Sequence, residues 1–299
     1  MIETMQATPE VRAHPSRVEQ APRRIGPLPS YAALAALTAI WLLPVAYAFA
    51  TSFKSPTETA YSGFSLLPAH WVAENYVTLF QGSASYPVFQ WFANSLVIST
   101  SHAALTVVIV ALAGYGYTRM RFRGRDALFL TLLAISLFPT VVNLIPSFKV
   151  VQTLGWVNSP LAMIVPGLAG VANIFLVRSF MAGVPRELDE AARVDGAGDF
   201  RIFTQIILPS IRPILIVVFL FSFTGAWNDF LWPTIVFNDI EKMPITAGLL
   251  LLQNMFGGYS AFGQLMASAV LAMIPTTALF LVAQRYFISS LQLSSGIKG

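Results

Sequence analysis

The residues best suited to contact another molecule are concentrated between Pro185 and Pro213, a segment that we call the docking loop. It carries five of the chain's 14 acidic residues, namely Glu187, Asp189, Glu190, Asp195 and Asp199. The surrounding sequence is mostly apolar, and Gly196 and Gly198 interrupt the loop in its middle. Charged side chains fix the register of a contact between proteins. We therefore predict that this loop docks on a partner protein.

Residue types that catalyse reactions are scarce. The chain has no cysteine, which excludes disulfides, thiolate metal sites and cysteine nucleophiles. A phosphate-binding Walker A loop needs Gly-Lys followed by Ser or Thr, whereas the lysines follow Phe, Phe, Glu and Ile at Lys54, Lys149, Lys242 and Lys298. No Ser-His-Asp order, pair of catalytic carboxylates or metal-ligand spacing is visible. We therefore expect a protein that is not an enzyme and holds no ATPase site, cofactor or metal of its own.

The composition identifies the solvent in which the chain folds. Hydrophobic residues make up 56% of the sequence and charged residues 11%, against about 25% charged residues in an ordinary soluble domain. The mean hydropathy is +0.66. These values predict an integral membrane protein.

Six apolar segments are long enough to cross a bilayer, which takes about 20 helical residues. They run from Tyr31 to Phe53, Ser95 to Tyr117, Ala127 to Phe148, Ser159 to Val177, Pro213 to Phe237 and Leu265 to Ala283. Prolines within them would permit bends, at Pro139, Pro146, Pro166, Pro233 and Pro275. The sequence therefore predicts an all-α, polytopic membrane protein with six transmembrane helices and both termini on one side.

Lysine and arginine are distributed unevenly between the two sides. The side of the termini carries 15 of the 18: Arg12, Arg17, Arg23, Arg24, Arg119, Arg121, Arg123, Arg125, Arg178, Arg186, Arg193, Arg201, Arg212, Arg285 and Lys298. The positive-inside bias places that side, with the docking loop, in the cytoplasm. Because these basic residues flank spans, we expect no nucleic-acid partner. Residues 1–27 are polar and rich in proline, and we expect a mobile cytoplasmic tail before a single membrane domain over residues 28–299.

The docking loop has the signals of two short helices. Pro185 suits the start of the first, and acidic residues in its first turn complement the helix dipole. Ala191 and Ala192 would let a partner's backbone approach closely. Gly196 and Gly198 would end this helix, and Asp199 would cap a second one that runs to Leu208. An ordinary amphipathic helix at the membrane interface is the alternative.

A few polar residues inside the predicted spans could contact a solute. Asp229 is the acidic residue within a span, and ionisable residues there usually face the bundle or a water-filled cavity. With Trp227 and Asn228 it could offer hydrogen-bond acceptors and a stacking face to a sugar, and Asn94 and Asn143 are weaker candidates. Packing and contacts between helices are the alternative roles of these residues.

The spacing of the docking loop resembles the EAA loop of ABC-importer permeases. The matching positions are Glu190-Ala191-Ala192, Asp195-Gly196-Ala197, Phe203, Ile206, Leu208-Pro209 and Pro213. Further segments are similar to the maltose-type carbohydrate permeases: Ala113-Gly114-Tyr115 with Arg119, Phe122, Gly124 and Arg125; Phe138-Pro139; Ile145-Pro146-Ser147-Phe148; Trp227-Asn228-Asp229-Phe230 with Pro233; and Ser295-Gly296-Ile297-Lys298-Gly299. The six spans and short tail resemble the smaller permease subunit of that group.

The resemblance implies a type I importer permease fold in a bacterial or archaeal cytoplasmic membrane. Its partners would be a second homologous permease in a heterodimer, a dimer of cytoplasmic ATPase subunits that bind ATP and Mg, an extracytoplasmic solute-binding protein, and membrane lipid. The implied ATPase-coupling residues are Glu190, Ala191, Ala192, Asp195, Gly196, Ala197, Phe203, Leu208 and Pro209. The solute would be an oligosaccharide or monosaccharide, with glycerol 3-phosphate or a polyol as alternatives. A secondary transporter or channel that works alone is the rival function.

Overall fold

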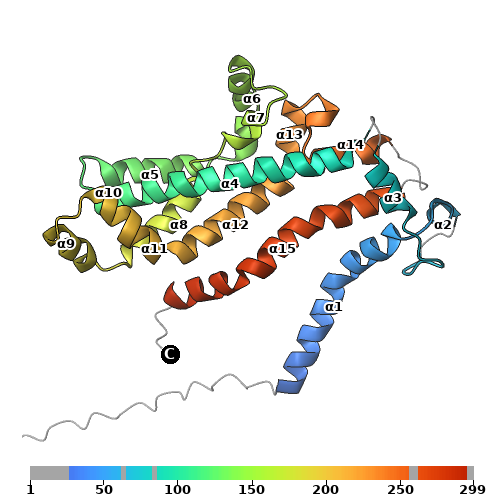
Figure 1. Ribbon diagram of the computed structural model, residues 1–299, viewed down its shortest axis with the longest axis horizontal. Helices are drawn as coiled ribbons and strands as arrows, with labels where there is room; N and C mark the ends of the chain where they lie inside the picture. The colour runs from blue at the N-terminus through green and yellow to red at the C-terminus, as the bar shows by residue number, and fades with distance from the viewer. Residues whose placement is uncertain (1–26, 62–64, 83–85, 256–261, 295–299) are drawn as a thin grey trace, which may run out of the picture. The chain divides into compact units, whose positions relative to one another are not determined.

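The computed structural model describes residues 27–61, 65–82, 86–255 and 262–294 (Figure 1). Every regular element in these ranges is helical, which confirms the predicted all-α fold. The predicted tail up to residue 26 and the segment from Ser295 to Gly299 lie outside the described residues. The chain divides into two parts, residues 1–46 and 47–299, and each is described by itself.

The first part contains most of helix α1 (Pro27–Ser52), which is apolar and long enough to cross a membrane. Pro44 lies inside this helix without ending it. Large apolar side chains are exposed along it, among them Ile40 and Trp41. An apolar surface of this kind belongs in lipid or against another apolar helix.

In the second part, α4 (Val88–Arg119) packs against α8 (Val171–Ala182) and α12 (Arg212–Asn228), and α12 also packs against α15 (Phe262–Ser294). Figure 1 shows α4, α12 and α15 running lengthwise beside one another. A glycine permits the close approach of α4 to α8, because a Cβ atom on Gly114 would lie 2.8 Å from Cγ1 of Val177. Small residues serve this purpose at contacts between membrane helices.

Buried side chains form separate clusters at the two ends of α4. The cluster at the Arg119 end joins α4 and α8 to the docking loop and includes Tyr115, Val177 and Phe203. The cluster at the other end includes Trp91 and Trp227 and joins α4, α12 and α15 to α3 (Glu74–Gln81) and α14 (Ile245–Met255). The chain after α1 also forms α2 (Pro56–Tyr61) and the short 3-10 helix η3 (Ile240–Lys242).

The third predicted span is not one continuous helix. Helix α5 (Arg125–Ser136) is followed by a 3-10 turn, η1 (Thr140–Asn143), and by α6 (Leu144–Thr153), and the two halves are bent by 91°. Pro139 lies at the bend. Proline has no N–H to donate and disfavours helical backbone at the residue before it, so the helix ends before Phe138.

The fourth and fifth predicted spans are also interrupted. In the fourth, α7 (Leu161–Ile164) is separated from α8 by a turn that contains Pro166 and by Gly167, whose φ is +83°. In the fifth, α12 ends at Asn228 and α13 (Leu231–Val236) follows after Asp229. The sixth span is continuous, because α15 runs through Pro275.

Within the described residues, three helices are long and apolar enough to cross a membrane, or up to five if each bent pair is one span. The second bent pair joins Asp199–Ser210 to Arg212–Asn228 at 77°. Helices α8 and α14 are apolar but shorter than a span. The described helices are consistent with the six predicted crossings.

Candidate functional site

The docking loop folds into two short helices joined by a glycine bend, as predicted. Helix α9 (Glu187–Val194) begins two residues after Pro185, and α10 (Asp199–Ile202) continues through a π-helical turn, η2 (Phe203–Ile207), into α11 (Leu208–Ser210). Gly196 has a φ of +79°, which L side chains rarely adopt. The second helical segment ends at Ser210, two residues beyond its predicted end at Leu208.

Asp199 does not cap the second helix, contrary to expectation. The N-cap residue is Gly198, and no side chain accepts a hydrogen bond from the first turn of α10. The Asp199 carboxylate instead forms an ion pair with Arg193 across the glycine bend. The Asp199 carboxylate therefore makes a charge-assisted contact with Arg193 in place of the predicted capping hydrogen bond, and this contact joins the end of α9 to the start of α10.

The predicted coupling residues divide between the surface and the interior. Glu190, Ala191, Asp195, Gly196 and Pro209 are exposed, Ala192, Ala197 and Leu208 are partly buried, and Phe203 is buried with 7% of its surface exposed. The three partly buried residues pack on the same cluster as Phe203. The first group can touch a partner, while the second attaches the loop to the helix bundle.

Three apolar residues on the outside of the docking loop escaped the sequence analysis. Val194 is 88% exposed, Phe200 is 78% exposed and Leu188 is also exposed. Large apolar side chains gathered on an exposed charged loop are typical of a binding surface. Leu188 and Val194 lie on α9 before the bend at Gly196 and Phe200 lies on α10 after it, so no single sequence period groups the three.

A buried ion pair fastens the docking loop to the end of α4. Nε of Arg119 lies 3.1 Å from Oδ2 of Asp189, and only 4% and 11% of the two side chains are exposed. Arg119 also donates through Nη2 to the carbonyl oxygen of Val184 at 2.7 Å. Sequence reasoning gave Asp189 only a helix-dipole role. The available signal was its spacing from Ala192, since residues three apart share a helix face.

Two further contacts join the same elements. Nη2 of Arg186 donates to the carbonyl oxygen of Thr118 at 3.3 Å. The Tyr115 hydroxyl donates to the carbonyl oxygen of Asp199 at 3.4 Å, and its ring lies 5.1 Å from that of Phe203. Both helices of the docking loop are therefore attached to the last turns of α4.

The residues predicted to line a solute pathway have different surroundings. Trp227 is 1% exposed, its Nε1 donates to the carbonyl oxygen of Ala272 at 3.0 Å, and its ring packs on Phe92 and Phe223. The expected stacking face is therefore covered by packing in this structure. Asn94 is likewise occupied, because its Nδ2 donates to the carbonyl oxygens of Glu241 and Met243 at 2.7 and 3.0 Å.

Asp229 and Asn228 lie at the break between α12 and α13. Oδ1 of Asp229 accepts from the backbone N–H of Trp232 at 3.3 Å, and its carbonyl oxygen accepts from the Thr246 hydroxyl at 2.6 Å. The first of these contacts satisfies a backbone N–H in the first turn of α13, whose N-cap residue is Phe230. Asn228 is exposed and donates to the carbonyl oxygen of Thr224 within its own helix, and Asn143 is exposed in η1. Asn143 and Asn228 are therefore exposed and Asp229 is partly buried, so packing within the chain does not enclose these three side chains.

Comparison with known proteins supports the assignment made from the docking loop. The family described as binding-protein-dependent transport system inner membrane component matches residues 106–292. The arabinooligosaccharides transport system permease protein AraQ of Bacillus subtilis is 32% identical over 265 residues, covering 88% of this chain and 92% of the relative. The galactooligosaccharides transport system permease protein GanQ of the same organism is 34% identical over 274 residues, covering 90% and 95%.

The fold is also found among solved structures. A chain of a bacterial ABC transporter involved in the import of the acidic polysaccharide alginate superposes with a TM-score of 0.76. The two chains are 22% identical, and the match covers 87% of this chain and 95% of the other. The predicted importer permease fold is confirmed. The chain belongs to the family of inner membrane components of binding-protein-dependent transport systems.

Proposed function

We propose that this chain is the permease subunit of an ATP-driven carbohydrate importer and forms half of its translocation pathway. The family and the oligosaccharide permeases among the relatives support this function. The structural observation that carries it is α9 of the docking loop, a short helix with exposed charged and apolar side chains that a buried ion pair holds to α4. Family membership argues against the rival in which the chain transports a solute alone.

The docking loop binds a separate ATPase subunit in this proposal. The sequence contains no Gly-Lys-Ser/Thr loop, so ATP and Mg are held by that partner. A second homologous permease completes the pathway, and an extracytoplasmic solute-binding protein delivers the carbohydrate. These are the partners that a binding-protein-dependent importer requires.

The termini and the docking loop face the cytoplasm of a bacterial or archaeal cell in this arrangement. Two arginine-bearing segments that the sequence assigns to one side, the end of α4 and the docking loop, are in direct contact through Thr118 and Arg186. Their proximity supports the predicted sidedness.

Transport proceeds by alternating access. Closure of the ATPase pair moves α9, and the Arg119–Asp189 ion pair passes that movement to α4, while Phe203 and Leu208 pass it to the bundle through the buried cluster. Asn143, Asn228 and Asp229 are the proposed solute contacts of this chain. Trp227 and Asn94 support them by packing and by holding the segment from Glu241 to Met243.

Affinity capture of the tagged chain from native membranes in mild detergent tests the proposal. We expect mass spectrometry to detect a second permease and a Walker-containing ATPase. Recovery of the chain alone, together with solute movement in liposomes without ATP, would overturn the proposed function.

The same experiment on Glu190→Arg tests the docking face. Reversal of this exposed charge in the first turn of α9 is expected to reduce recovery of the ATPase by roughly tenfold, the effect of about 1.4 kcal/mol at an interface. Glu74→Arg is the matched control, because Glu74 is exposed in the first turn of α3. Equal recovery with both variants would contradict the role of Glu190.

A further inference from the structure

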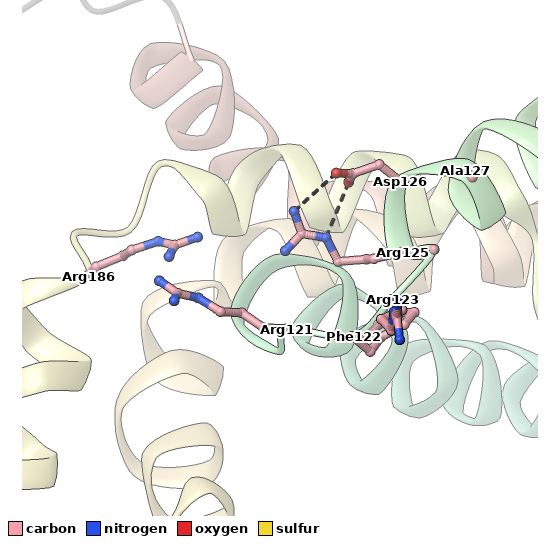
Figure 2. Close-up of a pocket in the computed structure, with 8 residues that line it drawn as sticks. Arg121, Phe122, Arg123, Arg125, Asp126, Ala127 and Arg186 are labelled. Atoms are coloured by element: carbon pink, nitrogen blue, oxygen red, sulfur yellow. Dashed lines mark hydrogen bonds and ion pairs between the residues drawn. The ribbon is translucent and has the colours of Figure 1, made fainter.

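A strongly basic hollow lies beside the docking loop, and the proposed function does not use it. It has a volume of about 690 Å³ and opens between the turn that follows α4 and the start of the docking loop. Four arginines line it, Arg121, Arg123, Arg125 and Arg186, with Asp126 as the single carboxylate (Figure 2). The lining therefore carries a net positive charge.

The single carboxylate of the hollow, that of Asp126, already forms ion pairs with two arginines. Oδ1 of Asp126 lies 3.2 Å from Nε of Arg125 and 3.2 Å from Nη2 of Arg178, so two guanidinium groups share it. The guanidinium of Arg178 also lies 4.1 Å from the centre of the Phe129 ring. Asp126 therefore leaves no negative charge for the remaining arginines of the hollow.

Arg121, Arg123 and Arg186 form no ion pair with any described residue of the chain. Arg186 reaches only the carbonyl oxygen of Thr118. Figure 2 shows the side chains of Arg121 and Arg186 extending toward each other from the two sides of the hollow. Both arginines also line an adjoining hollow with Asp189, Glu190 and Asp199, but no ion pair joins either arginine to these carboxylates. Like charges that face one another repel, and an anion between the two guanidinium groups would reverse this cost through charge-assisted hydrogen bonds.

The surroundings identify the kind of anion. Phe122 lies among the arginines and is 46% exposed, and Met120 and Leu128, which precede and follow the segment from Arg121 to Ala127, are also exposed. The last residue of the second predicted span is Tyr117 and the first of the third is Ala127, so the hollow lies where both spans leave the hydrocarbon. Arginine donates in pairs to phosphate oxygens, and basic pockets between membrane helices on the cytoplasmic side bind lipid head groups.

We propose that this hollow binds the phosphate of an anionic phospholipid. Arg121 and Arg186 hold the phosphate between them, Arg123 adds attraction, and Phe122, Met120 and Leu128 contact the acyl chains. The lipid would connect the end of α4 to the start of the docking loop. The site requires only that the chain spans a membrane, and it can therefore be tested independently of sugar transport.

The test titrates the detergent-purified chain, with the subunits that accompany it, against phosphatidylglycerol and phosphatidylcholine. Native mass spectrometry counts the bound lipids. We expect saturable binding of phosphatidylglycerol that phosphatidylcholine does not reproduce. The variant Arg121→Gln/Arg186→Gln should weaken this binding about 30-fold, since each arginine near an anionic head group contributes about fivefold.

The matched control is Arg201→Gln/Arg212→Gln, which removes two exposed arginines outside the hollow and should retain wild-type binding. Equal lipid binding by the two variants would overturn the site. Displacement of the lipid by inorganic phosphate at comparable concentration would show a site for a soluble anion instead. If Arg121→Gln/Arg186→Gln lost a protein partner but kept its lipid, the hollow would be an acidic protein's docking site and the proposal would be wrong.

Discussion

Arg119 and Asp189 show how much of the docking loop's position depends on one contact between two residues. Among the described residues this is the ion pair with both side chains nearly covered. Asp189→Asn would leave the guanidinium buried without its counter-ion. We expect a loss of about 3 kcal/mol in the free energy of unfolding, measured as a lower apparent melting temperature of the detergent-purified complex.

Two variants control for general effects of losing charge. Asp126→Asn removes a carboxylate that also pairs with arginines but is 65% exposed, so solvent screens its charge and the substitution should cost much less stability than Asp189→Asn. Arg119→Met/Asp189→Leu removes both buried charges and should recover much of the stability. Equal stability of Asp189→Asn and Asp126→Asn would refute the claim that this ion pair holds α9.

At the scale of elements, the bend between α9 and α10 determines where the docking face points. Gly196 has a φ of +79° and Gly198 is extended, and a Cβ atom on either would meet nothing within 4 Å. A substitution at Gly196 therefore acts through the backbone alone. Gly196→Val should strain the bend by about 1–2 kcal/mol and turn α9 away from its partner, whereas Gly198→Val should be tolerated.

The measurement is ATP-dependent sugar uptake by the complex reconstituted in liposomes. We expect the Gly196→Val chain to insert normally and the complex that contains it to hydrolyse ATP with greatly reduced sugar uptake. The complex with Gly198→Val should take up sugar at close to the wild-type rate. Wild-type uptake by Gly196→Val would contradict the coupling role of the bend.

At the scale of the whole second part, α4 connects a buried cluster near its first turns to another near its last turns. Trp91 and Arg119 lie 28 residues apart on this helix, which corresponds to roughly 42 Å. Trp91 is fully buried, its Nε1 donates to the carbonyl oxygen of Ile240 at 2.6 Å, and a Cβ atom on Gly248 would lie 2.2 Å from its ring. The fit of α14 against α4 therefore depends on this glycine.

Gly248→Ala should lower stability by about 2 kcal/mol through overpacking. Gly225→Ala, in another helix with open space around it, should be neutral or slightly stabilising. Because the two ends of α4 are far apart, the effects of Gly248→Ala and Asp189→Asn should add within about 0.5 kcal/mol. Thermal unfolding of the single and double variants measures this, and strong non-additivity would contradict two independent cores.

The sequence by itself determined the membrane setting, the all-α fold, the family and the two-helix form of the docking loop. Hydropathy, the acidic first turn of α9 and the glycines at positions 196 and 198 are local signals, and local signals can be read along the chain. Hydropathy stays high along the third, fourth and fifth predicted spans, so it did not reveal the breaks within them. Pro139 and Pro166 indicated two of these breaks. Apolar content reports burial in lipid or protein and does not report backbone direction.

Only the tertiary structure decided which charged and polar side chains are buried. Asp189 and Glu190 are neighbours in one acidic turn, yet the first is buried against Arg119 and the second is exposed. Trp227 and Asp229 are two residues apart, yet one is packed in a core and the other lies at the break between α12 and α13 and accepts from a backbone N–H of α13. The burial of Asp189 depends on a contact with α4 and that of Trp227 on a contact with α15, and both helices are distant in sequence. The free energy of burying a charge or a ring depends on those neighbours and cannot be inferred from residue type alone.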